Sequence, residues 1–82
     1  MNKPYVIYNL EEAKKQLDHI LKDVENDGSY DFGAYKVDMQ HLYHHLNTAW
    51  NARQSSQEES RECAEKDFEK WRQFPGDIYM GI

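Results

Sequence analysis

The sequence of 82 residues has a single cysteine, two prolines and four glycines, and it lacks any long apolar run. One cysteine excludes an intramolecular disulfide, and nothing else points to an oxidising compartment. No segment approaches the roughly 18 apolar residues that a membrane span needs. The apolar run near the N-terminus is also shorter than the ~7–15 residues of a signal peptide. We therefore expect a cytoplasmic protein without a membrane partner.

Clusters of positive charge are missing as well. Asp and Glu number 15 against 10 Lys and Arg, so the formal net charge is −5. This charge repels a phosphate backbone, and nucleic acid is therefore not an expected partner. Phosphate-binding glycine loops, nucleophile elbows and dinucleotide fingerprints are absent, and Cys63 has no histidine near it in sequence. We expect neither an enzyme nor a bound cofactor.

Aromatic residues are plentiful, with six Tyr, three Phe and two Trp in this short chain. Disordered segments are poor in aromatics, so their number indicates a folded domain. The length allows one domain, residues 1–82, with a thin core. Domains of this size often bury further surface against a partner.

The spacing of apolar residues predicts three helices, at about 10–25, 36–54 and 57–74. In the first, Asn9 is expected to be the N-cap and Glu12 to complete a capping box. Asn26–Ser29 then ends the helix with turn-forming residues. The predicted apolar stripe of this helix consists of Leu10, Ala13, Leu17, Ile20, Leu21 and Val24.

The second helix has two candidate N-caps, Asp31 and Asp38, and its start is placed between residues 34 and 38. Ser56 and Glu59 form a capping box for the third helix. Pro75 ends that helix, because the residue before a proline avoids the α region. A rival interpretation fuses the second and third helices into one.

These elements predict an all-α fold, a small antiparallel three-helix bundle with apolar tails at both ends. The tails, Tyr5–Tyr8 and Ile78–Ile82, could cover the end of the bundle, pair as short strands, or meet a second copy of the chain. A homodimer is therefore left open. Charges placed in the core by Leu17→Asp or Leu42→Asp are each expected to unfold the domain.

Histidines are concentrated in the second predicted helix. Asp38, His41 and His45 are spaced i, i+3 and i+7, with His44 beside them. Imidazoles four residues apart on a helix can share a metal ion such as Zn²⁺, with a carboxylate as a further ligand. Ordinary solvated histidines are the alternative interpretation of the same cluster.

An aromatic flank on the second helix suggests a surface for a protein partner. It comprises Tyr35, Tyr43 and Trp50, and Asn47 and Asn51 lie farther around the helix, toward solvent. Large aromatic anchors beside amides are typical of protein interfaces, although the same rings could cover a thin core. The leading hypothesis is a non-enzymatic protein–protein interaction module, with itself as one candidate partner. A metal- or ligand-binding protein that uses the histidine cluster is the alternative.

Overall fold

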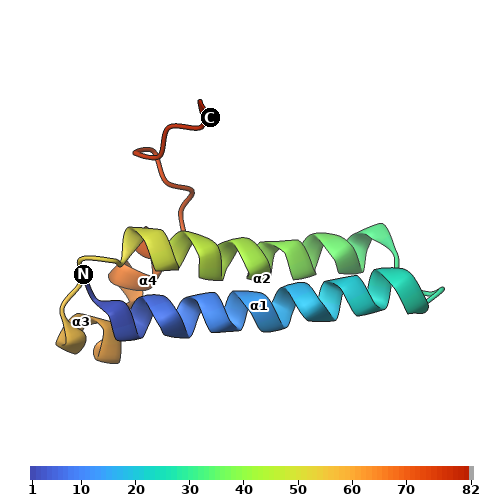
Figure 1. Ribbon diagram of the computed structural model, residues 1–82, viewed down its shortest axis with the longest axis horizontal. Coiled ribbons are helices and arrows are strands. Elements are labelled where there is room, and N and C mark those ends of the chain that lie inside the picture. The colour runs from blue at the N-terminus through green and yellow to red at the C-terminus, as the bar shows by residue number, and fades with distance from the viewer. Residues whose placement is uncertain (82) are drawn as a thin grey trace.

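The computed structural model describes residues 1–81, so Ile82, the last residue of the predicted C-terminal tail, lies outside the described part. Within this part the chain folds into four helices: α1 (Lys3–Asn26), α2 (Phe32–Asn51), α3 (Gln57–Glu62) and α4 (Glu65–Trp71). The long helices α1 and α2 pack side by side as an antiparallel hairpin, and α3 and α4 lie near its end that holds the N-terminus (Figure 1). The all-α prediction is confirmed, and residues 1–81 contain no strand.

The start of α1 differs from the prediction, because Asn9 is not its N-cap. Asn2 caps the helix instead, and its side-chain oxygen accepts from the Tyr5 amide at 3.3 Å. Asn9 lies inside the helix, only 2% exposed, and donates to the Tyr5 carbonyl. The predicted N-terminal tail therefore forms the first turns of α1.

The turn between the long helices agrees with the local sequence. Asp27 follows the last residue of α1, and its side chain accepts from the Ser29 amide and hydroxyl. Asp31, one of the two candidate caps, accepts from the Ala34 amide at 2.9 Å. α2 therefore starts before the predicted interval, and it ends at Asn51 rather than near residue 54.

The third predicted helix is divided into α3 and α4, and it is not fused with α2. The capping box of Ser56 and Glu59 is confirmed. Cys63 then adopts the left-handed region at φ 43°, which stops α3 and redirects the chain into α4. As a result Trp71, the last residue of α4, is 4% exposed, and its ring centroid lies 5.8 Å from that of Tyr5.

The core of the hairpin is smaller than the predicted stripe. Ala13, Ile20 and Leu42 are buried together. The other stripe positions of α1 are about half exposed: Leu10 is 48% exposed, Leu17 45%, Leu21 50% and Val24 57%. Leu17, Leu21 and Val24 lie toward the turn between the long helices, and α3 and α4 lie at the other end of the hairpin. The predicted closed three-helix bundle is thus replaced by a two-helix hairpin with a capped end and an open end. None of the helices within residues 1–81 is long and apolar enough to cross a bilayer.

Candidate functional site

The open end of the hairpin carries an apolar groove between α1 and α2, which we call the distal groove. Its volume is about 600 Å³. Its lining residues are Leu17, Ile20, Leu21, Val24, Tyr30, Asp31, Phe32, Tyr35, Met39 and Leu42. Phe32 is 77% exposed, and Asp31 is the one charged residue in the lining. Tyr35 is the only member of the predicted interaction surface that lines this groove.

The two asparagines of that predicted surface are used inside the chain. Asn47 is buried and donates to the Arg72 carbonyl at 3.0 Å. Asn51 donates to the carbonyls of Trp71 at 2.8 Å and Gln73 at 2.6 Å. Carbonyls at a helix C-terminus have no partner within their own helix, so these amides satisfy the end of α4 and hold it against α2.

Tyr43 and Trp50, the other predicted anchors, contact the segment that follows α4. Tyr43 packs edge-on against Phe74, with ring centroids 5.1 Å apart. The indole of Trp50 donates to Asp77 at 2.8 Å, and the Arg53 guanidinium lies 3.9 Å above its ring. These rings therefore fix the C-terminal segment to α2 within the monomer.

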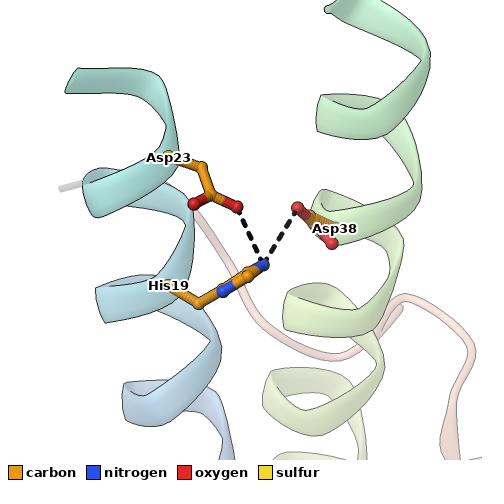
Figure 2. Close-up of side chains that lie close together, drawn as sticks. All are labelled: His19, Asp23 and Asp38. Atoms are coloured by element: carbon orange, nitrogen blue, oxygen red, sulfur yellow. Dashed lines mark ion pairs between the residues drawn. The ribbon is translucent and has the colours of Figure 1, made fainter. Parts of the chain in front are cut away.

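A polar cluster bridges the two long helices close to the turn. Figure 2 shows His19 and Asp23 of α1 pointing toward Asp38 of α2. The Nε2 atom of His19 lies 3.1 Å from an Asp23 oxygen and 3.7 Å from an Asp38 oxygen. One donor atom from each residue lies within 4.8 Å of the other two. The His19 side chain is 55% exposed, and the two carboxylates are more shielded, at 26% and 18%.

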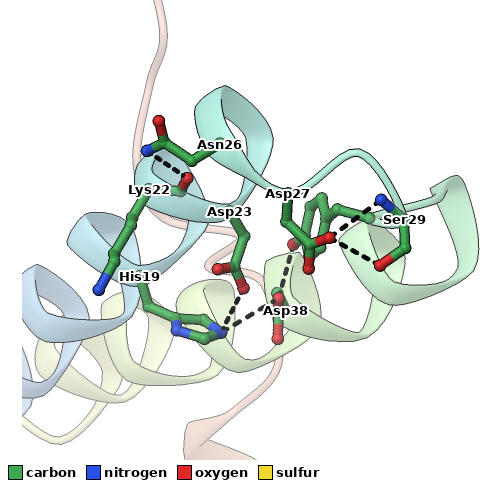
Figure 3. Close-up of polar contacts among 8 residues, drawn as sticks. His19, Lys22, Asp23, Asn26, Asp27, Ser29 and Asp38 are labelled. Carbon is green, nitrogen blue, oxygen red and sulfur yellow. Dashed lines mark hydrogen bonds and ion pairs between the residues drawn. The ribbon is translucent and has the colours of Figure 1, made fainter.

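Tyr30 joins this cluster from the turn. Its hydroxyl donates to the same Asp38 oxygen at 2.6 Å, and its backbone amide donates to the Asp27 carbonyl at 3.0 Å. The Asp27 side chain in turn accepts from the amide and the hydroxyl of Ser29 (Figure 3). Partial removal from water is the main cause that raises the pKa of Tyr30 to about 12. The hydrogen bond to Asp38 and the negative charge of Asp38 raise it further. The hydroxyl therefore keeps its proton at neutral pH and orients the carboxylate.

The four residues of the predicted metal cluster do not converge on one point. Asp38 faces His19 across the helix pair, and His41 is exposed. His44 and His45 pack ring against ring, with centroids 4.9 Å apart. Within residues 1–81, the one group of three or more potential ligands is His19, Asp23 and Asp38. Sequence reasoning overlooked the first two, although their i,i+4 spacing on an exposed helix face was a readable signal.

His44 and His45 instead border a small cavity at the capped end of the hairpin. Its volume is about 160 Å³. The lining residues are Tyr5, Tyr8, Asn9, His44, His45, Thr48, Cys63, Phe68 and Trp71. His45 Nδ1 pairs with the Asn9 side-chain oxygen at 3.2 Å. The buried Thr48 Oγ1 and His44 Nδ1 have no partner within the described chain.

The unpartnered hydroxyl of Thr48 leads to a stability prediction. The residue is 3% exposed, and an unsatisfied buried hydroxyl costs roughly 1–3 kcal/mol. Thr48→Val removes this group at nearly constant shape, and we expect the free energy of unfolding to rise by about 1 kcal/mol. Urea denaturation measures it, with Thr48→Ser as the control that keeps the hydroxyl. A loss of stability in Thr48→Val would show instead that the hydroxyl has a partner in solution.

The electrostatics of the neighbouring histidines follow from the same burial. Removal from water is the main cause that lowers the pKa of His44, and the nearby charges of His45, Arg72 and His41 lower it further. Burial likewise lowers the pKa of His45, partly opposed by the Glu12 carboxylate. Both imidazoles are therefore neutral at pH 7.

These shifts predict acid sensitivity in a defined range. An unfolded histidine has a pKa of about 6.5, so below that pH the unfolded chain binds more protons than the native protein. We expect full stability above about pH 6.5 and a free energy of unfolding that falls as the pH drops below that value. Urea denaturation at several pH values measures this slope. The double variant His44→Gln, His45→Gln should flatten it. His41→Gln removes only the smallest of the causes that lower the two pKa values, so it should change the slope much less. An equal slope in the wild type and both variants would show that His44 and His45 do not cause the acid sensitivity.

Comparisons with known proteins add no assignment. The chain matches no protein-family model, no curated protein and no solved structure. Its function is therefore inferred from its own residues.

Proposed function

We propose that this chain is a non-catalytic interaction module that works by pairing with a second copy of itself through the distal groove. The observation that carries the proposal is the groove itself. Large apolar side chains line it, and Phe32, Val24 and Leu21 are at least half exposed. Contiguous exposed apolar surface on a small domain is typical of a binding site.

No other described segment of the chain is placed to cover this groove. α4 packs on α2 at the capped end, and Trp50 and Tyr43 hold the segment after α4 against α2. In Figure 1 the C-terminal segment runs away from the helix pair. This arrangement supports a cover that comes from another molecule.

A second copy fits the shape and chemistry of the groove. Two antiparallel hairpins that pack face to face make a four-helix bundle, in which each apolar face covers the other. A two-fold axis uses the same patch on both molecules, so one contact covers both grooves. The lining carries a single charged residue, Asp31, and the chain's net charge of −5 therefore lies mostly outside the contact.

Sedimentation equilibrium over a range of concentrations tests the proposal. We expect the wild type to be a dimer that dissociates on dilution. Leu21→Glu places a charge in each copy's half of the contact and should weaken pairing by at least about 2 kcal/mol, or about thirtyfold. Val37→Glu is the matched control, because Val37 is 51% exposed against 50% for Leu21 and lies outside the groove.

Two results would contradict the proposal. One is a wild-type protein that stays monomeric at every accessible concentration, which would leave the groove to a different protein. The other is a dimer that Val37→Glu weakens as much as Leu21→Glu does. Circular dichroism confirms that each variant keeps its helical content, so that a change in mass reports association and not unfolding.

A further inference from the structure

We infer that His19, Asp23 and Asp38 form a binding site for a divalent transition-metal ion of the zinc class, held between α1 and α2. The site differs from the metal cluster expected from sequence, with which it shares only Asp38. Its three ligands lie outside the lining of the distal groove, and only the supporting residue Tyr30 also borders that groove. Either proposal can therefore fail without the other.

The spacing of the donor atoms fits a shared metal ion. Zinc binds imidazole nitrogen and carboxylate oxygen at about 2.0–2.2 Å, which puts neighbouring ligand atoms of a tetrahedral site about 3.3–3.6 Å apart. His19 Nε2 lies 3.1 Å from the Asp23 oxygen and 3.7 Å from the Asp38 oxygen. Small rotations of these exposed or half-buried side chains bring all three atoms to ligand distance (Figure 2).

The negative charges of the cluster also favour a bound cation. Two carboxylates converge on one imidazole, and no Lys or Arg forms an ion pair with Asp23 or Asp38 anywhere in residues 1–81. While the imidazole of His19 is neutral, the cluster holds two like charges that repel each other. A divalent ion neutralises both, and its binding needs the neutral imidazole.

Tyr30 supplies the outer support that a metal-binding carboxylate usually has. Its hydroxyl donates to Asp38 at 2.6 Å and fixes that carboxylate toward α1. Such outer hydrogen bonds typically contribute tenfold to a hundredfold to metal affinity. Tyr30 is therefore a positioning residue that does not touch the ion.

The ligand types select the class of ion. An imidazole nitrogen favours zinc and its transition-metal neighbours, whereas Ca²⁺ and Mg²⁺ prefer all-oxygen sites. Three protein ligands also leave at least one coordination position for water or another ligand. The ion would tie α1 to α2 beside the turn, and we expect it to raise the thermal stability of the hairpin.

Calorimetric titration of the chelator-treated full chain with zinc chloride at neutral pH tests the site. We expect one ion per chain. His19→Ala and Asp38→Asn should each weaken binding by more than tenfold, and Tyr30→Phe by about tenfold. His41→Ala is the matched control, because it removes an exposed histidine from the same region of α2 and should leave affinity unchanged.

The ring-nitrogen NMR signals of the histidines locate the ion independently of the variants. Zinc should shift the Nε2 signal of His19 and leave that of His41 in place. The inference is overturned if zinc produces no saturable binding, or if His19→Ala and Asp38→Asn bind it as tightly as the wild type. It is equally overturned if zinc shifts the signals of His44 and His45 and not that of His19.

Discussion

Leu42→Asp is expected to abolish the native fold at room temperature. Leu42 is 8% exposed and packs with Ala13 and Ile20 in the hairpin core. A buried charge without a partner costs about 3–5 kcal/mol, which is comparable to the whole stability of a domain with so small a core. Circular dichroism during urea denaturation should show loss of the cooperative transition.

Leu17→Asp is the matched control, and for it the structure changes the expectation from sequence. Both leucines were expected in the core, yet Leu17 is 45% exposed at the distal groove. The new carboxylate stays in contact with water, so we expect native helicity with weakened pairing. Unfolding of both variants to the same extent would show that the groove is closed in the monomer.

Trp71→Ala, at the capped end of the hairpin, is expected to lower the free energy of unfolding by a similar amount. Trp71 is 4% exposed, contacts Tyr5, and its carbonyl accepts from Asn51. Truncating a buried tryptophan costs about 3–5 kcal/mol. Thermal denaturation measures the loss. Hydrogen exchange should accelerate first in α4 and in the first turns of α1, because these elements meet at this ring.

Phe74→Ala provides the comparison for Trp71→Ala. Phe74 is also aromatic and follows α4 closely, but it is 70% exposed. We expect a change of less than about 1 kcal/mol from this truncation. If the two substitutions cost the same, or if exchange accelerates evenly along both long helices, then Trp71 does not hold the capped end together.

Local side-chain chemistry predicted several boundaries of the fold. The turn at Asp27 and the capping box of Ser56 with Glu59 depend on residues within three positions of one another. The cap at Asp31 is equally local, but Asp31 was only one of two candidates, and the predicted interval for the start of the helix was too late. Such bonds form wherever the backbone reverses or a helix begins, whatever packs around them. These features were therefore readable without knowledge of the tertiary structure.

The boundaries that sequence missed depend on distant contacts. Asn9 resembled an N-cap, but burial against α2 and its pairing with His45 keep it inside the helix. Pro4 at the start of α1 was an available signal, since proline suits the first turn of a helix. The left-handed turn at Cys63 had no such signal, because cysteine has no special preference for that conformation.

The candidate sites could be predicted only in part, because they too depend on contacts between residues distant in sequence. The sequence showed that Asp38 carries a carboxylate near histidines, but it could not show that the register of the hairpin faces it toward His19. The excess apolar surface was predicted, while its position was not. It was expected around Tyr35, Tyr43 and Trp50. Tyr35 does line the distal groove, whereas Tyr43 and Trp50 contact the chain's own C-terminal segment.

Pairing through the distal groove is the central claim, and contacts between copies test it most directly. In a sample that mixes isotope-labelled with unlabelled chains, filtered NMR experiments detect only contacts between molecules. We predict such contacts from the Phe32 and Tyr35 rings to the methyl groups of Leu17 and Leu21. The claim would be contradicted if the intermolecular contacts were confined to other surfaces. It would also be contradicted if no intermolecular contact were detected at high chain concentration.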